Sequence, residues 1–164
     1  MGRVVATIEQ AIELAVKHHK GQVDKAGQPY ILHPLRLMQN MKNEIDQIVA
    51  VLHDIVEDTP VTLEELKERG FSLDIVNAVD CLTKRENESY NQFIDRVCED
   101  AIASRVKLAD LEDNMDLSRL AEIKEEDRAR LEKYQSAHDK ITNSTRTCSG
   151  CGNPPIYCDC HEYV

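Results

Sequence analysis

The spacing of apolar residues constrains the fold of this chain more than any other feature of its sequence. Over residues 8–16, apolar side chains recur three and four positions apart, which places them on one face of a helix. The same spacing returns over 45–55, 75–82, 93–97 and 102–113. No segment alternates convincingly between apolar and polar residues with the period of two that is typical of strands. The sequence therefore predicts an all-α bundle.

Helix-breaking and helix-capping residues divide this pattern into elements. The stretch 21–29 contains two Gly and one Pro, so we expect a loop there, and Pro34 suits the first turn of the next helix. The Thr-Pro pair at 59–60 ends the third helix, and Ser72 and Ser89 are candidate N-caps of later helices. These signals predict several helices joined by loops.

The composition changes after the last helical pattern, which runs from Glu125 to about Ile141. Four of the six Cys and two of the five Pro fall in the stretch 142–164, where apolar periodicity vanishes. A stretch this short cannot bury a hydrophobic core of its own. We therefore expect one helical domain over 1–141 and a separate Cys-rich appendage over 142–164.

Charge and hydropathy exclude several classes of partner. The chain carries 20 Lys and Arg against 30 Asp and Glu, a net charge of −10, which argues against general binding to nucleic acid or to anionic membranes. No apolar run approaches the roughly 18–20 residues of a membrane span, and the N-terminus lacks the apolar core of a signal peptide. We therefore expect a cytoplasmic protein whose Cys are reduced thiols or metal ligands.

Polar residues interrupt the third apolar helix at one place. The segment 53–58 reads His-Asp-Ile-Val-Glu-Asp, and we expect it to continue this helix. His53 and Glu57 are four residues apart, as are Asp54 and Asp58, so each pair would share one helix face. A His beside an Asp on an otherwise apolar helix is costly unless the two pair or bind a metal. Surface polar residues and a satisfied core histidine are the alternative interpretation.

Two further residues complete a candidate metal site. His33 lies just before Pro34, at a helix start, and Asp110 follows an apolar lead-in. With His53 and Asp54 they would supply nitrogen and oxygen ligands, a mixture that suits Mn²⁺, Fe²⁺, Co²⁺ or Zn²⁺. A metal held only by these ligands keeps positions open for water and substrate, which indicates a catalytic site. Spacing alone does not bring His33 and Asp110 to His53.

Three segments, in this order, resemble motifs of the RelA/SpoT-type HD hydrolases. They are 19–34 (HKGQVDKAGQPYILHP), 53–59 (HDIVEDT) and 106–114 (VKLADLEDN), and the resemblance spans residues 4 to about 141. It implies an HD-domain helical bundle that removes the 3′-pyrophosphate from guanosine tetraphosphate or pentaphosphate with the help of one Mn²⁺. The partner it implies is a small-molecule nucleotide, an alarmone of the stringent response.

The resemblance also assigns roles to individual residues. A metal lowers the pKa of a bound water toward neutrality, and a nearby carboxylate can then accept its proton. The implied metal ligands are His33, His53, Asp54 and Asp110. The residues implied for positioning or deprotonating water are Glu57 and Asp58, and those for binding substrate are Lys25, Asn114, Arg130 and Tyr134. Glu112 and Asp113 either support this site or face solvent.

One position departs from the family pattern. The nucleotide loop of the family commonly reads Arg-Lys, whereas this chain has Asp24 and Lys25, so a guanidinium that could stack on a base is absent. Lys84 and Arg85 would supply substitute positive charge for phosphates, or form an exposed basic loop. The alternatives are therefore an HD phosphohydrolase that acts on NADPH or nucleoside phosphates, and a non-catalytic nucleotide-binding or interaction protein.

The 23 residues after position 141 are too few for the synthetase domain that longer family members carry, so we expect a hydrolase without one. Within them, Cys148 and Cys151 are followed by Cys158 and Cys160. Four thiolates in so short a segment suit a tetrahedral structural Zn²⁺, which would let a segment without a core fold. The ligands would be all four Cys, or three of them with His161, and a disordered tail is the alternative.

Overall fold

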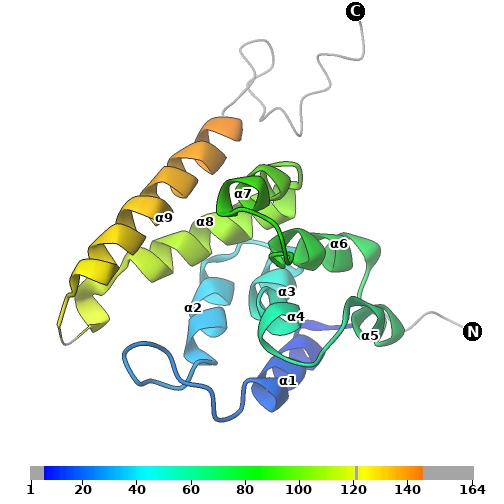
Figure 1. The fold of residues 1–164 in the computed structure, drawn as a ribbon. Coiled ribbons are helices and arrows are strands. Elements are labelled where there is room, and N and C mark those ends of the chain that lie inside the picture. The colour runs from blue at the N-terminus through cyan, green and yellow to red at the C-terminus, as the bar shows by residue number, and fades with distance from the viewer. Residues whose placement is uncertain (1–5, 121, 146–164) are drawn as a thin grey trace, which may run out of the picture.

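A computed structural model describes residues 6–120 and 122–145 of the chain (Figure 1). The predicted zinc ligands Cys148, Cys151, Cys158 and Cys160 lie outside the described residues, as does His161. The described part is built from helices and contains no strand, only an isolated bridge between Val23 and Pro29. The prediction of an all-α fold is therefore confirmed.

The helices follow one another with short connections along most of the described chain. The first five are α1 (Ile8–His18), α2 (Leu32–Asn40), α3 (Glu44–Leu52), α4 (Ile55–Asp58) and α5 (Leu63–Glu68). They are followed by α6 (Leu73–Leu82), α7 (Tyr90–Cys98), α8 (Ala101–Met115), the 3₁₀ helix η1 (Leu117–Arg119) and α9 (Glu125–Ser144). The last helix thus extends a few residues past the boundary expected near residue 141.

Side-chain caps begin the helices where the sequence indicated them. Ser72 and Ser89 accept hydrogen bonds from backbone amides in the first turns of α6 and α7, and Asp100 does the same for α8. These bonds satisfy amide groups that have no partner within the helix. At the end of α5, Gly70 adopts a φ of 90°, a left-handed conformation that glycine takes without strain.

Helix α3 is the centre of the bundle. It packs against α1, α2, α6 and α8, and its residues 48–52 are all buried. A helix surrounded on so many sides must be apolar nearly all round, which explains the continuous apolar run. One buried acid on it, Asp46, accepts hydrogen bonds of 2.6 and 2.8 Å from Arg105 of α8. Segment 53–58, which holds the predicted metal ligands His53 and Asp54, directly follows this buried helix.

The expectation of one unbroken helix through 53–58 is wrong. Helix α3 ends at Leu52 and α4 begins at Ile55, with a turn at His53 and Asp54 between them. The carbonyl of Ala50, which in an unbroken helix accepts from the amide of residue 54, accepts here a 2.8 Å hydrogen bond from His53 Nδ1. The break changes the direction of the chain at the two residues predicted to bind metal.

The remaining elements enclose one side of this break. Helix α9 runs alongside α8 and α7, and the long loop between α1 and α2 lies on the same side of the bundle as the α8–α9 connection (Figure 1). None of the described helices is both long enough and apolar enough to cross a membrane. The loop between α1 and α2, together with η1 and α9, surrounds the site described next.

Candidate metal centre and adjoining cavity

Three of the predicted metal ligands form a tight cluster at the helix break. His33 on α2, His53 at the end of α3 and Asp54 offer ligand atoms that all lie within 4.8 Å of one another. Asp110 of α8 joins them, because its Oδ1 lies 3.2 Å from His33 Nε2 and 3.8 Å from His53 Nε2. The fold thus brings together four residues that are up to 77 positions apart in the sequence.

The two imidazole rings present the same nitrogen to this cluster. His53 Nδ1 donates to Ala50 O, and His33 Nδ1 lies 2.7 Å from Asp113 Oδ2. Each Nε2 therefore faces the cluster. His53 Nε2 is buried and lies 2.9 Å from Asp54 Oδ2, yet it makes no well-directed hydrogen bond to any described residue. A buried nitrogen without a hydrogen bond, in a ring fixed through its other nitrogen, fits a ligand to a divalent metal.

Electrostatic coupling holds the cluster in a charged state. Burial lowers the pKa of the His33 imidazole, but its hydrogen bonds to Asp110 and Asp113 outweigh burial and raise the pKa to about 9. Burial raises the pKa of the carboxylates of Asp54 and Asp110, but neighbouring positive charge lowers it further, from His53 for Asp54 and mainly from Lys107 for Asp110. The carboxylates are therefore ionised and able to bind a cation.

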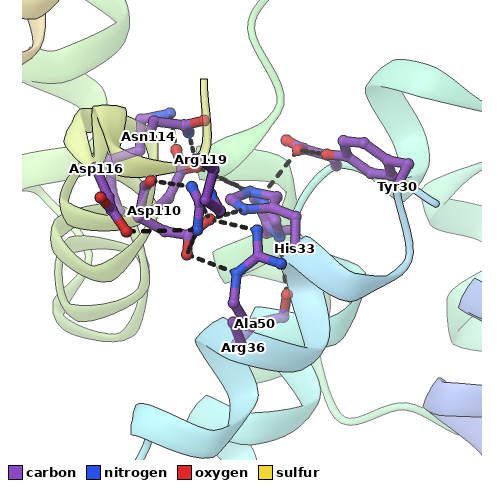
Figure 2. Close-up of polar contacts among 12 residues, drawn as sticks. Tyr30, His33, Arg36, Ala50, Asp110, Asn114, Asp116 and Arg119 are labelled. Carbon is purple, nitrogen blue, oxygen red and sulfur yellow. Dashed lines mark hydrogen bonds and ion pairs between the residues drawn. The ribbon is translucent and has the colours of Figure 1, made fainter. Parts of the chain in front are cut away.

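Asp110 is positioned by two neighbours on its own helix. Lys107 Nζ lies 2.7 Å from Asp110 Oδ2. Asn114 Nδ2 donates to Asp110 Oδ1 over 2.5 Å, a contact that Figure 2 shows. The ammonium of Lys107 also lies 5.2 Å from the centre of the Phe93 ring. Sequence reasoning assigned Asn114 only to substrate and overlooked Lys107. Its position three residues before Asp110, one helical turn away, was the available signal.

Tyr30 is a second residue that sequence reasoning missed. Its hydroxyl donates to Asp54 Oδ2, and its ring lies 4.9 Å from that of His19 and 5.7 Å from that of His33, measured between centroids (Figure 2). Burial and the charge of Asp54 raise the pKa of the Tyr30 hydroxyl. The hydroxyl therefore stays protonated and orients the Asp54 carboxylate.

Asp113 connects His33 to two arginines. It lies 2.7 Å from His33 Nδ1, and its two carboxylate oxygens accept from Arg36 Nε and Nη2 over 2.8 and 2.9 Å. Arg119 Nη1 donates to Asp113 Oδ1 over 2.8 Å. Burial raises the pKa of Asp113, but these partners outweigh burial and lower it. The sequence left Asp113 open between the site and solvent, and the structure places it beside His33, a predicted metal ligand. Glu112 is exposed.

A cavity of about 290 Å³ opens beside the cluster. His33 and Asp54 line its inner end. The four predicted substrate-binding residues, Lys25, Asn114, Arg130 and Tyr134, all line it as well. Apolar side chains of Val23, Leu117 and Leu120 complete part of the wall. A cavity with a few convergent polar groups and an apolar wall is typical of a small-molecule site.

The predicted catalytic pair lies at the edge of this arrangement. Glu57 and Asp58 are exposed on α4, and neither is among the residues that line the cavity. Glu57 Oε2 accepts a 2.9 Å hydrogen bond from the backbone amide of Lys84. Burial, followed by the charges of Asp54 and Glu57, raises the pKa of the Asp58 carboxyl. Glu57 thus ties the basic loop at Lys84 to α4, and Asp58 is electrostatically coupled to Asp54.

The acid that departs from the family pattern has a local role in the loop. Asp24 Oδ1 accepts hydrogen bonds of 2.9 Å from the amides of Ala26 and Gln28, which closes the turn through Gly27. Gly27 has a φ of 77°, a conformation that few other residues adopt. An Asp at the start of such a turn satisfies two loop amides at once. The carboxylate therefore shapes the loop that presents Lys25 to the cavity.

Comparison with known proteins adds to this geometry. The chain is 35% identical over 138 residues to a guanosine-3′,5′-bis(diphosphate) 3′-pyrophosphohydrolase of Aquifex aeolicus, covering 77% of this chain and 19% of that protein. It is 32% identical over 142 residues to a GTP pyrophosphokinase of Myxococcus xanthus, covering 76% of this chain and 18% of that protein. The chain spans about a fifth of the length of these curated relatives. No model of a protein family matches it.

A solved structure shares the fold. It is described as a metazoan orthologue of SpoT that hydrolyses ppGpp and acts in starvation responses, and the superposition has a TM-score of 0.67. It covers 95% of this chain and 92% of that chain at 20% sequence identity. The all-α arrangement around a His/Asp cluster is that of an HD domain. The sequence matches identify the family within this class. The chain belongs to the RelA/SpoT-type HD hydrolases.

Proposed function

We propose that this chain is a Mn²⁺-dependent phosphohydrolase that releases pyrophosphate from the 3′ side of guanosine tetraphosphate or a related alarmone. One observation carries the proposal. Two buried imidazole Nε2 atoms and the carboxylates of Asp54 and Asp110 converge at the inner end of a cavity. Lys25 and Arg130, two cations suited to phosphate, line the same cavity. The named activity of the Aquifex aeolicus relative supports this choice of reaction.

A bound divalent metal would polarise a phosphoryl oxygen and acidify a water molecule. The chain itself supplies the other functions. His33, His53, Asp54 and Asp110 would hold the metal. Their own orientation is fixed by the Ala50 carbonyl, Asp113, the Tyr30 hydroxyl and Lys107. We assign to the Asp58 carboxylate the acceptance of the proton from the attacking water, since its raised pKa favours proton uptake. Glu57 would position this segment through the Lys84 amide.

Incubation of the full chain with Mn²⁺ and guanosine tetraphosphate tests the proposal. We expect stoichiometric release of pyrophosphate and GDP. The matched control is the double variant Glu57→Gln and Asp58→Asn, which keeps size and hydrogen-bonding groups but removes both proton acceptors. It should bind Mn²⁺ normally and release no pyrophosphate. A Mn²⁺-loaded wild-type protein that leaves guanosine tetraphosphate intact would refute the alarmone assignment.

The loop at Asp24 favours a second candidate substrate class. Residue 24 is an Asp, and its carboxylate binds the loop amides of Ala26 and Gln28. This position therefore offers no guanidinium that could stack on a guanine. A phosphohydrolase of the same mechanism that acts on NADPH or on nucleoside phosphates is therefore the second candidate. A panel of these compounds, assayed with Mn²⁺ beside guanosine tetraphosphate, separates the two. The larger kcat/KM identifies the substrate class.

A further inference from the structure

Two arginines in the wall of the cavity have no role in the reaction proposed above. Arg36 comes from α2 and Arg119 from η1, and both line the cavity beside His33 (Figure 2). Their side chains are 33% and 31% exposed, so part of each guanidinium is accessible to a ligand. Sequence reasoning singled out neither residue, because they are distant from each other in the chain and belong to no recognised motif.

Asp113 holds both guanidinium groups in fixed orientations. Arg36 donates to it through Nε and Nη2, and Arg119 donates through Nη1 and Nη2. Among the described residues, Arg36 Nη1 and Arg119 Nε have no hydrogen-bond partner. Two further acids face this pair: Asp116 Oδ2 lies 3.9 Å from Arg119 Nη1, and Asp24, which also lines the cavity, contributes to the raised pKa of Arg36. Oriented guanidinium groups with spare N–H donors are suited to phosphate oxygens.

The arginine pair lies on the opposite side of the His33 ring from the metal centre. His33 Nε2 faces Asp110 at 3.2 Å, whereas Nδ1 faces Asp113 at 2.7 Å. One imidazole ring and one carboxylate therefore separate the candidate metal position from the two guanidinium groups. A nucleotide with phosphates at two ribose positions carries two anionic groups, with the sugar between them. The cavity offers spare guanidinium N–H donors for one of these groups and the candidate metal position for the other.

Building on the proposed function, we propose that Arg36 and Arg119 form a second anion subsite for the 5′-phosphates of a nucleotide whose 3′-diphosphate lies at the metal centre. Asp113 orients both side chains before substrate binds, which reduces the conformational entropy lost on binding. The subsite makes a nucleoside phosphorylated at both the 3′ and 5′ positions the preferred substrate class. It determines specificity and takes no part in the bond-breaking step.

The first test compares two substrates with the same leaving group. Guanosine tetraphosphate carries a 5′-diphosphate, and guanosine 3′-diphosphate carries no 5′-phosphate. With the Mn²⁺-loaded full chain, we expect Arg36→Gln and Arg119→Gln each to raise KM for the tetraphosphate about tenfold to a hundredfold, since each removes a charge-assisted contact. KM for the 5′-unphosphorylated substrate and kcat for both should change less than about threefold.

Matched variants separate this role from a structural one. Arg128→Gln removes one exposed positive charge from α9 outside the cavity and should leave both KM values unchanged. Arg119→Lys keeps the charge but loses the planar fork, and should give an intermediate KM. Equal losses with both substrates would show that the arginines only support Asp113 and His33, and would overturn the subsite. An increase in the KM for guanosine tetraphosphate as large in Arg128→Gln as in Arg119→Gln would also overturn the subsite.

A binding measurement tests the subsite independently of hydrolysis. Calorimetric titration of the Mn²⁺-loaded chain with GDP, which lacks a 3′-phosphate, should show binding that Arg36→Gln and Arg119→Gln weaken about tenfold or more. Titration with guanosine should be the same for all variants. If alarmone hydrolysis fails but GDP binding depends on both arginines, the subsite stands without the proposed function. If hydrolysis proceeds and the affinity for GDP is unchanged in Arg36→Gln and Arg119→Gln, the subsite is wrong and the proposed function stands.

Discussion

The inner and outer ends of the cavity are built in different ways. At the inner end, His33 lines the cavity with His53 and Asp110 packed beside it; the three are 6%, 1% and 4% exposed and belong to α2, the end of α3 and α8, which pack together. The outer end uses Lys25 from a loop and Arg130 from the first part of α9. The inner geometry is therefore fixed by the core, whereas Lys25 is exposed to solvent and, among the described residues, Arg130 is held only by Asp127 of its own helix. In the proposed function, the inner end would hold the metal, and the outer end would contact the substrate together with Arg36 and Arg119.

Loss of an inner-end ligand should have the largest effect. His53→Gln removes the buried Nε2, and we expect both metal content and pyrophosphate release to fall, the latter by about 10⁴-fold, because the metal supplies several kcal/mol of transition-state stabilisation. Metal analysis beside a pyrophosphate assay measures this. Arg130→Gln at the outer end is the contrast, with normal metal content and a raised KM. Identical metal content in His53→Gln and wild type would show that His53 does not hold the metal and would contradict the role given to the inner end.

The edge residue Asp58 should affect turnover without affecting the metal. Asp58→Asn removes the carboxylate assigned to proton acceptance, so kcat should fall about 10²–10³-fold while KM and Mn²⁺ affinity stay near wild type. Steady-state kinetics and a Mn²⁺ titration check the two parts. Asp74→Asn, an exposed acid in the first turn of α6, is a charge-matched control and should be fully active. Full activity of Asp58→Asn would assign the proton to another group.

Asp113 joins His33 of the inner end to Arg36 and Arg119, so its removal should weaken metal binding moderately. Asp113→Asn replaces the carboxylate that orients His33, and we expect Mn²⁺ affinity to fall about tenfold to a hundredfold. Calorimetric titration with Mn²⁺ measures this directly. Glu112→Gln, its exposed neighbour, is the control and should bind Mn²⁺ like wild type. An unchanged affinity in Asp113→Asn would mean that the core alone orients the imidazole.

Proton competition should make metal binding depend on pH. The pKa of His33 in the metal-free protein is raised to about 9, so this ring is protonated at neutral pH and must lose a proton when a metal binds. Mn²⁺ affinity should therefore rise with pH, up to about tenfold per unit, and level off above about pH 9. For the metal-free protein the sign is opposite. Stability from the protonated ring is full below about pH 6.5 and is lost as pH rises through about 9.

These two trends are separable by experiment. Mn²⁺ titrations between pH 6 and 10 give the first, and thermal unfolding with chelator over the same range gives the second. Asp113→Asn should flatten both profiles, since it removes one of the hydrogen bonds that raise the pKa. Affinity that falls with rising pH in this window would contradict the assigned charge of the inner end.

The smallest effect is expected at a helix cap that does not line the cavity. Ser89 Oγ caps α7 by accepting from the amide of Gln92 over 3.2 Å. Ser89→Ala should lower the free energy of unfolding by about 1 kcal/mol and the Tm by about 2–4 °C. Ser89→Thr keeps the hydroxyl and should stay near wild type. Metal affinity and turnover should be unchanged in both, and a change in either would tie α7 to the site.

Much of the fold followed from local rules. The apolar spacing predicted the helical class, and Ser72 and Ser89 marked helix starts that the structure retains. The failure at residues 53–54 is also physical. A helical pattern records which residues are apolar, but the His53 side chain competes for the Ala50 carbonyl, and this cannot be read from periodicity. The turn there is what directs Asp54 toward His53 Nε2.

The sequence predicted which residues form the candidate site better than it predicted the contacts that orient them. Motif resemblance proposed four metal ligands and four substrate-binding residues, and the fold gathers them at one cavity and its floor. Of the residues that orient those ligands, Tyr30 had no distinguishing spacing, Lys107 was marked only by its place one helical turn before Asp110, and Asp113 was left open between the site and solvent. Arg36 and Arg119 gain a shared partner only through tertiary packing. The contacts of Tyr30 with Asp54 and of Asp113 with His33 and Arg36 join residues distant in sequence, so no local pattern encodes them.

The sequence by itself determined the helical class, the set of candidate site residues and the resemblance to a hydrolase family. It could do so because side-chain periodicity and residue type are local properties of the chain. Only the tertiary structure decided that His33 and Asp110 meet His53, which imidazole nitrogen faces the cluster, and that one carboxylate supports both a ligand and two arginines. Those outcomes depend on how α2, α3 and α8 pack, and packing is a property of the whole chain.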